Sequence, residues 1–293
     1  MRFHLIMATR GRVAEVERFL ASLVEQDGAD ALLTIVDQNP DARLDALVAR
    51  FGERIEIEHL KQSRPAASAA RNLGLRHPRG ALIGFPDDDC IYPPGLLAGI
   101  AAVFADRAVE GLSVRILGLD RDEDAFGFGP GRSMAIDHDS AWLCGVTPSM
   151  FFRRELAEQV AFDEQMGPGA TWTGGEDTDY LLRCLDRGAR HVYRHELFIR
   201  HPMPSLARPL SQLIDREFHY GRGFGYLVAR RRIPARLVRE QMALPWSLLL
   251  RALATGDWRR AATCPGMGVG RLLGYAEGRR RPMDLPVAAG QQV

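Results

Sequence analysis

Cysteine and lysine are both scarce in this chain of 293 residues. Its four cysteines are scattered and form no CxxC pair: Cys90, Cys144, Cys184 and Cys264. A disulfide framework or a zinc site needs a set of suitably spaced cysteines, so the sequence argues against both and favours a reducing compartment. Lys61 is the sole lysine among 38 basic residues, which we interpret as a compositional bias of the source.

Long uncharged apolar runs are also missing. The best run, Met242–Leu250, is far shorter than the roughly 18–20 residues that span a bilayer. Met1 leads directly into an alternating apolar segment, without the cationic and then apolar leader of a secreted protein. We therefore expect a cytoplasmic protein.

Several catalytic and binding motifs are absent as well. The sequence contains no G-x-S-x-G, no convincing cysteine–histidine pairing, no GxGxxG and no P-loop GxxxxGK[ST]. Zinc-ligand spacing and nucleic-acid motifs are missing too. Nucleophilic serine or cysteine chemistry is therefore unsupported, and no nucleic acid is expected as a partner.

Charge is unevenly distributed, although the net charge of the whole chain is only +1. Residues 208–293 hold 15 arginines and 6 acidic residues, a net charge of +9, which leaves −8 for the rest of the chain. Such a basic segment suggests anionic partners, such as phospholipid headgroups at the inner face of a membrane or a lipid-linked phosphate. A solvated helical surface is the alternative interpretation.

Strand patterns alternate with helical patterns through the first two-thirds of the chain. Strands are expected at residues 3–8, 31–36, 55–60, 80–85, 114–119, 191–193 and 197–200. Helices are expected at residues 12–26, 44–51, 66–76, 153–159 and 176–187, and the chain is helical after Pro209. This order predicts an α/β domain at residues 1–207, with a mostly parallel sheet between helices, and a basic helical extension at residues 208–293.

Polar residues follow several of the expected strands. They are Thr9, Arg10, Asp37, Asn39, Asp87, Asp88 and Asp89. Because parallel sheets bind ligands at the carboxyl ends of their strands, we expect these residues to form a binding site.

The cluster Asp87-Asp88-Asp89 is the strongest local signal. Three adjacent carboxylates repel one another unless a cation compensates them. In an extended segment Asp87 and Asp89 point to one side, where they can address one Mg²⁺ or Mn²⁺. A solvated acidic turn is the alternative, but the position directly after a buried strand favours the metal site.

A second acidic cluster, Glu176-Asp177-x-Asp179, follows two glycines at an expected helix start. A carboxylate at such a helix start can act as a general base that takes a proton from a substrate hydroxyl, and Asp177 is the candidate. Acidic residues are also common in the first helical turn because they complement the helix dipole.

Two weaker candidates are Arg71 and His201. Arg71 lies in a small-residue segment that could bring a helix N-terminus near phosphates, although an Arg-Asn pair on a helix is more often at the surface. His201 follows an expected strand and is a candidate third metal ligand or phosphate contact, although a single histidine before proline is more often a loop residue.

In this order the clusters resemble the family 2 glycosyltransferases of the GT-A fold. The resemblance extends from Phe3 to His201. Four features carry it: Ala8-Thr9-Arg10; Ser68-Ala69-Ala70-Arg71-Asn72-Leu73-Gly74; Ile83-Gly84-Phe85-Pro86-Asp87-Asp88-Asp89; and an acceptor-side block with Phe151-Phe152-Arg153-Arg154, Phe162-Asp163-Glu164 and Gly175-Glu176-Asp177-x-Asp179.

The resemblance implies a role for each candidate. The donor contacts would be Thr9, Arg10, Asp37, Asn39, Arg71, Asp87 and Asp88. Asp89 would hold the metal directly, with Asp87 and His201 as further ligands. Asp177 would be the base, and Glu176 would orient it or contact the acceptor.

The resemblance also implies an activity: inverting transfer of a sugar from a nucleotide-diphosphate donor to a hydroxyl group, assisted by Mg²⁺ or Mn²⁺. The acceptor would be a saccharide or a lipid-linked sugar in cell-surface polysaccharide or glycolipid synthesis. A sugar-phosphate nucleotidyltransferase and a non-catalytic relative that binds sugar nucleotides are the alternatives. Substrate choice would depend on the loops at residues 127–131 and 167–172.

Overall fold

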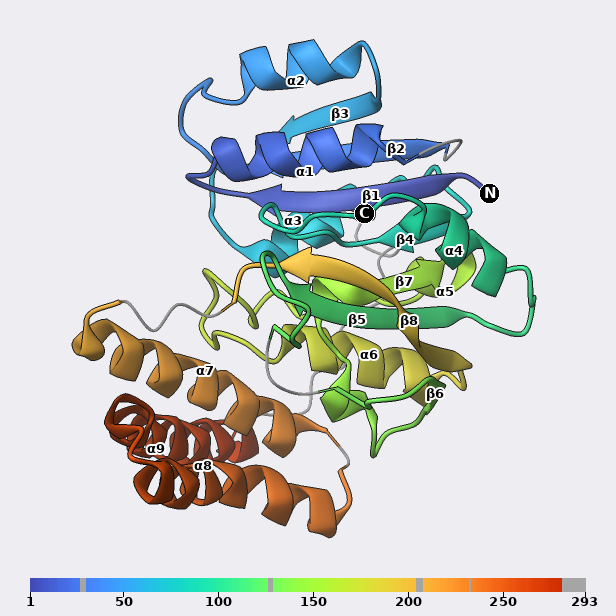
Figure 1. The fold of residues 1–293 in the computed structure, drawn as a ribbon. Helices are drawn as coiled ribbons and strands as arrows, with labels where there is room; N and C mark the ends of the chain where they lie inside the picture. The colour runs from blue at the N-terminus through green and yellow to red at the C-terminus, as the bar shows by residue number, and fades with distance from the viewer. Residues whose placement is uncertain (27–29, 126–128, 204–207, 232, 281–293) are drawn as a thin grey trace. The chain divides into compact units, whose positions relative to one another are not determined.

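The structure is a computed structural model that describes residues 1–26, 30–125, 129–203, 208–231 and 233–280 (Figure 1). These residues form two compact units. Unit 1 holds the described residues of Met1–Phe162 and Tyr180–Pro204, and unit 2 holds those of Asp163–Asp179 and Ser205–Pro286. The expected boundary after residue 207 stays a prediction, since residues 204–207 lie outside the described ranges.

Unit 1 is built on an eight-stranded, mostly parallel sheet with the order β3-β2-β1-β4-β7-β5-β8-β6. Its strands are β1 (Phe3–Thr9), β2 (Ala31–Asp37), β3 (Glu56–Lys61), β4 (Leu82–Gly84), β5 (Gly111–Gly118), β6 (Met134–Ile136), β7 (Met150–Arg153) and β8 (His191–His201). Strand β1 pairs in parallel with β2 and β4, β2 with β3, and β5 with β8. Strand β7 is antiparallel to both β4 and β5, and β6 is antiparallel to β8. The predicted α/β class is thus confirmed.

Several elements differ from expectation. The two short strands expected at residues 191–193 and 197–200 are one strand, β8, because Val114 pairs with Arg194 and Arg115 with Phe198, which leaves residues 195–197 as an irregularity in the ladder. Strands β6 and β7 were not expected. Arg153, expected to begin a helix, ends β7 instead, where its guanidinium donates hydrogen bonds to backbone carbonyls.

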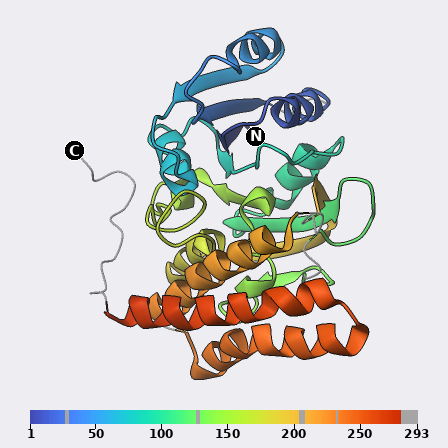
Figure 2. The same cartoon turned by 90° about the vertical axis from the view of Figure 1, so that its left-hand side faces the viewer.

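Helices cover both faces of this sheet (Figures 1 and 2). They are α1 (Ala14–Val24), α2 (Asp45–Gly52), α3 (Ala67–Gly74), α4 (Leu96–Val103), α5 (Arg154–Ala157) and α6 (Glu176–Asp186), whose first four residues belong to unit 2. Leu5 of β1 shares a buried core with Phe19 of α1 and Ile100 of α4. Because side chains alternate along a strand, Ile6 faces the other way and contacts Gly74 of α3.

An aromatic cluster packs under the end of β4. Tyr180 of α6 stacks on Phe162 with ring centroids 4.2 Å apart, and its ring meets Phe85 and Phe152 edge-on. All four side chains are fully buried. Since Phe85 precedes the aspartate cluster by two positions, this packing holds the backbone from which those carboxylates project.

Unit 2 consists of α7 (Leu210–Arg230), α8 (Ala235–Thr255), α9 (Trp258–Arg280) and the segment Asp163–Asp179. Helices α7 and α9 lie side by side in both views (Figures 1 and 2). Their backbones approach closely at Gly225, Gly270 and Gly274, where a Cβ atom would overlap a carbonyl oxygen of the facing helix. The segment is held to these helices by Trp172, which stacks on Tyr226 with centroids 3.8 Å apart.

None of the helices is both long and apolar enough to cross a bilayer, as far as the described residues are concerned.

Candidate active site

The sheet register brings the first set of predicted residues together. Thr9 and Asp37 are direct neighbours across the parallel pair of β1 and β2. The Thr9 hydroxyl donates a hydrogen bond of 2.7 Å to Oδ2 of Asp88, which follows β4. Three adjacent strand ends are therefore linked at one edge of the sheet. Arg10 has an exposed side chain, and its donor contact stays a prediction.

Asp37 is the centre of a polar cluster at this edge. Its carboxylate is buried and accepts hydrogen bonds from the backbone and side-chain amides of Asn39, at 2.8 and 2.7 Å. Lys61 Nζ lies 2.7 Å from Oδ2, and His59 Nε2 lies 3.0 Å from it. Burial alone would raise the pKa of Asp37, but the hydrogen bonds from Lys61, Asn39 and His59 outweigh it and lower the pKa. Asp37 is therefore a fixed anion.

An open pocket of about 560 Å³ adjoins this cluster. Its lining residues lie at or just after the ends of β2 and β3: Asn39, Pro40, Asp41, Ala42, Lys61, Gln62 and Ser63. Our sequence reasoning missed Lys61 here and interpreted it only as compositional bias. The signal that could have identified it is that Lys61 is the only lysine of the chain. In the structure this lysine forms an ion pair with the buried Asp37.

Asp88 bonds to Thr9, whereas Asp87 and Asp89 converge on His201. Residues 88 and 89 lie in a turn and not in an extended segment, so strand alternation does not separate Asp88 from Asp89. Arg12, a residue that sequence reasoning missed, pairs through Nη1 with Asp88 at 2.5 Å and with Asp89 Oδ2 at 2.6 Å. Burial raises the pKa of Asp88 to about 6, against the opposing effects of Arg12 and Thr9.

Asp87 and Asp89 converge with His201. One ligand atom from each of the three lies within 4.8 Å of the others. His201 Nε2 is 3.2 Å from Oδ1 of Asp89 and 3.7 Å from Oδ2 of Asp87. The convergence follows from a bridge between Ile91 and Arg200, whose backbone amides bond each other's carbonyls at 2.8 and 2.9 Å and so tie the aspartate turn to the end of β8.

This cluster fits a divalent cation. Two carboxylates and one imidazole suit Mn²⁺, and carboxylate oxygens suit Mg²⁺. Nδ1 of His201 donates to the Pro202 carbonyl at 2.8 Å, which leaves Nε2 as the atom that faces the carboxylates. Burial would lower the pKa of His201, but Asp87 and Asp89 raise it to about 10. The carboxylates of Asp87 and Asp89 thus concentrate negative charge at the place where a cation would bind.

Arg71 and Asn72 have different roles although they are adjacent. Nη2 of Arg71 lies 3.2 Å from Oδ1 of Asp87, and its guanidinium covers the ring of Phe162. Asn72 makes two hydrogen bonds with the backbone of Phe162, at 2.8 and 3.0 Å. Asn72 thus fixes the chain after β7 and α5, while Arg71 lies at the acidic cluster.

The second acidic cluster belongs to unit 2. Gly174 and Gly175 have positive φ angles of 83° and 85°, which turn the chain sharply into α6. Glu176 and Asp177 occupy the first helical turn, and Glu176 is buried. Asp179 is also buried and pairs with Arg231 at 2.6 Å.

Asp89 and Asp177 lie in different units, so their meeting in one pocket stays a prediction. Of the two loops expected to govern substrate choice, residues 167–172 belong to unit 2. In the other, residues 127 and 128 lie outside the described ranges.

Residues 4–159, just over half of the chain, match the family model "Glycosyl transferase family 2". "Glycosyltransferase AglE" of Haloferax volcanii is 24% identical over 176 residues, which cover 56% of this chain and 52% of that protein. The chain thus spans about half the length of the curated relative that it matches.

Two solved structures are similar over most of the chain. S. aureus TarS 1–349 has a TM-score of 0.61 and 14% identity, and the match covers 95% of this chain and 92% of that one. Mannosyltransferase PcManGT from Pyrobaculum calidifontis, in complex with GDP-Man and Mn²⁺, has a TM-score of 0.66 and 20% identity, with 94% and 86% covered. At these identities the likeness shows a shared fold, GT-A.

Proposed function

The chain belongs to glycosyl transferase family 2, and from this premise we propose that it is an inverting, metal-dependent enzyme that uses a nucleotide-diphosphate sugar. The observation that carries the proposal is the convergence of Asp87, Asp89 and His201 beside the strand ends that hold Asp37. A cation site next to a polar pocket suits a donor that has a nucleoside at one end and a diphosphate at the other.

The donor would occupy the edge of the sheet in unit 1. We assign the nucleoside to the pocket beside Asn39 and Lys61, with Asp37 holding the groups that line it. The diphosphate lies toward Asp89, where Arg71 contributes positive charge. Thr9 acts through Asp88, whose carboxylate its hydroxyl contacts. PcManGT holds GDP-Man and Mn²⁺, and TarS structures hold UDP and UDP-GlcNAc, which supports this class of donor.

The reaction is one displacement at the anomeric carbon. Asp177 takes the proton of the acceptor hydroxyl, the hydroxyl oxygen bonds to the anomeric carbon, and the bond from that carbon to the diphosphate oxygen breaks. A bound Mg²⁺ or Mn²⁺ supplies positive charge that stabilises the leaving nucleoside diphosphate. Asp87, Asp89 and His201 would hold the ion, and buried Glu176 would orient the neighbouring base.

We also propose that the protein works at the cytoplasmic face of a membrane, on a saccharide or lipid-linked acceptor for cell-surface polysaccharide or glycolipid synthesis. The support is an exposed apolar stripe on α8, where Trp246, Leu250 and Leu253 follow one another at i, i+4 and i+7. A second exposed set lies on α9, at Val269, Leu272 and Leu273. Since residues 208–293 carry a net charge of +9, an anionic lipid surface is the partner that complements both properties.

The activity is tested by a screen of nucleotide-diphosphate sugars for binding and slow hydrolysis, with Mn²⁺, with Mg²⁺ and with EDTA. We expect one donor to bind and turn over only when the cation is present. Sugar-phosphate-dependent release of pyrophosphate from a nucleoside triphosphate would identify the nucleotidyltransferase instead. No binding of any sugar nucleotide in the presence of either ion would contradict both activities.

The membrane contact is tested by co-sedimentation with vesicles of phosphatidylglycerol and of phosphatidylcholine. Binding to the anionic vesicles should fall as salt rises and in the double variant Leu250→Asn/Leu253→Asn. Leu143→Asn removes an exposed leucine of unit 1 and should bind like the wild type. Equal binding of all three proteins, or none, would return α8 to a purely structural role.

A further inference from the structure

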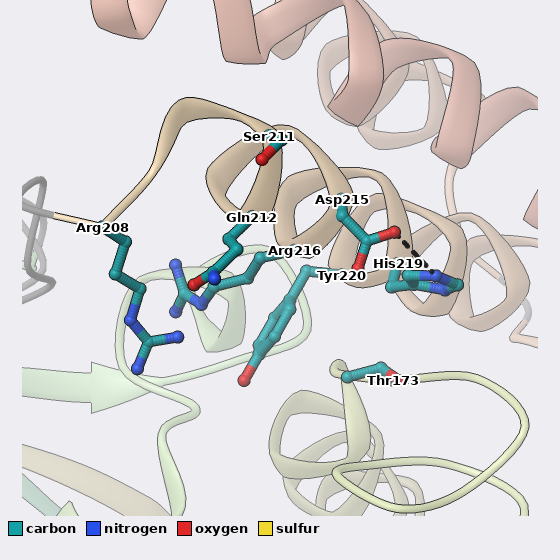
Figure 3. A pocket seen from close by; sticks show the side chains of 8 residues that line it. All are labelled: Thr173, Arg208, Ser211, Gln212, Asp215, Arg216, His219 and Tyr220. Carbon is teal, nitrogen blue, oxygen red and sulfur yellow. Dashed lines mark ion pairs between the residues drawn. The ribbon is translucent and has the colours of Figure 1, made fainter.

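Unit 2 contains an open pocket of about 590 Å³ that the donor site does not use (Figure 3). It is lined by Thr173, Arg208, Ser211, Gln212, Asp215, Arg216, His219 and Tyr220. All but Thr173 and Arg208 lie on α7, where Gln212, Arg216 and Tyr220 form one row at i, i+4 and i+8. One wall of the pocket is therefore the first part of α7, and the segment before α6 borders it at Thr173.

The side chains of this row present hydrogen-bond donors. Figure 3 shows Arg208, which lies just before α7, extending toward the same side as Gln212, Arg216 and Tyr220 of α7. Asp215 is the one carboxylate among the lining residues, and it pairs with His219 at 3.5 Å. The lining thus holds two guanidinium groups, those of Arg208 and Arg216, against the one carboxylate of Asp215.

The guanidinium group of Arg216 is positioned by two neighbouring side chains. Its guanidinium lies 4.7 Å from the ring centre of Tyr220, and Nη1 pairs with Glu217 at 3.1 Å. A guanidinium has five N–H donors in a planar fork, so these contacts fix its position without exhausting its donors. Such a fork matches the oxygens of a phosphate group.

The pocket also adjoins the proposed general base within the same unit. A Cβ atom on Gly174 would come within 2.8 Å of Tyr220 Cδ1, so the turn before α6 packs directly on the pocket wall. Burial raises the pKa of Tyr220, Arg216 opposes this rise, and the nearby carboxylates of Glu176 and Asp177 add to it. A group bound by Arg208 and Arg216 is thus placed on the acceptor side of the reaction.

We infer that this pocket binds a phosphate or diphosphate group of the acceptor, with Arg208 and Arg216 as its ligands. The inference rests on the proposed function, because the acceptor side is defined by Asp177. It adds a substrate class: the acceptor is a phosphorylated sugar, and its phosphate anchors the molecule while its hydroxyl group reaches the base. Arg208 and Arg216 then discriminate between charged and neutral acceptors.

The test is calorimetric titration of the full chain with inorganic pyrophosphate in EDTA, so that a donor-bound metal plays no part. Wild type should bind, and Arg208→Gln/Arg216→Gln should weaken binding by about tenfold or more. Arg107→Gln, at an exposed position in unit 1, is the control that should bind like the wild type. Arg71→Gln reports whether pyrophosphate occupies the donor site instead. Thermal melts confirm that each variant is folded.

Unchanged binding by the double variant, or loss in Arg71→Gln alone, would overturn the inference. Donor hydrolysis is measured on the same proteins. Intact hydrolysis without pyrophosphate binding at the pocket would refute this inference alone, whereas absence of hydrolysis would refute the proposed function. Competition then identifies the source of the phosphate. Stronger displacement of pyrophosphate by farnesyl diphosphate indicates a lipid-linked acceptor, and stronger displacement by glucose 1-phosphate indicates a water-soluble one.

Discussion

His201 Nε2 lies 3.2 Å from Asp89 Oδ1, although one residue ends β8 and the other lies in the turn after β4. The backbone bridge between Ile91 and Arg200 creates this proximity. Backbone hydrogen bonds to the sheet therefore hold the two side chains close together. A metal site requires such fixed positions of its ligands.

Removal of a carboxylate from this pair should abolish metal-dependent donor binding. We expect Asp89→Asn to lower sugar transfer roughly 100-fold or more, because the charge on the leaving diphosphate loses its compensation. Manganese binding followed by electron paramagnetic resonance measures the site directly. Asp106→Asn, an exposed carboxylate in the same unit, is the matched control. Wild-type manganese affinity in Asp89→Asn would refute the assignment.

A buried ion pair in unit 2 should matter for stability. Arg231 and Asp179 have side-chain exposures of 13% and 2%, so Arg231→Gln removes one partner and leaves a buried carboxylate. We expect a loss of about 3 kcal/mol in the free energy of unfolding, measured by denaturant titration. Arg236→Gln removes an exposed i,i+4 partner of Glu240 and should change the midpoint little. Equal midpoints for the two variants would contradict this.

Stability should also fall in mild acid because of His191. Burial lowers its pKa to about 3, whereas an unfolded histidine titrates near 6.5. Between these values the unfolded chain binds more protons, so stability rises with pH across this window and falls as pH falls. From pH 7.5 to pH 5 this one residue should account for a loss of about 2 kcal/mol.

The substitution His191→Gln isolates that effect. It retains polar groups that can reach Ser113, whose hydroxyl lies 2.8 Å from His191 Nε2. Urea titrations at the two pH values should show a smaller difference in the variant than in the wild type. The same pH dependence in both proteins would mean that another group is responsible.

The close packing of α7 on α9 should tolerate no added methyl group. At Gly270 and Gly274 a Cβ atom would overlap the carbonyl oxygens of Phe218 and Arg222, so the helices must move apart. We expect Gly270→Ala to cost about 2 kcal/mol or more, by thermal or urea unfolding. Gly52→Ala adds a methyl group with nothing within 4 Å and should be neutral or slightly stabilising. An unaffected Gly270→Ala would show that the helices are less tightly packed.

The sequence predicted the part of the site that depends on single strands. Short apolar runs that end in Thr9, Asp37 and Asp87 are visible without a structure, and parallel strands must bring such ends to one edge. Alternation placed Asp88 on the opposite side from Asp89, but both residues lie in a turn and contact Nη1 of Arg12. The GT-A fold was likewise accessible, because the order of these motifs is specific.

Other contacts could not be predicted because they depend on pairing between distant segments. Arg12 lies in a surface pattern before α1, and only the folded sheet places it on Asp88. Strand β7 lies antiparallel between β4 and β5. Its four residues are too few for a local sequence pattern to predict this position. The pocket at Arg216 requires two separate segments, and its row on α7 is visible only once a helix is known.

The proposed reaction uses two acidic groups with different tasks: Asp89 binds the metal ion and Asp177 accepts the proton. The most direct measurement compares donor binding and sugar transfer in Asp177→Asn. We predict wild-type affinity for the nucleotide sugar with Mn²⁺, and a loss of transfer by at least about 100-fold, because the acceptor hydroxyl loses its base. Full transfer by Asp177→Asn, or loss of donor binding together with transfer, would contradict the assignment.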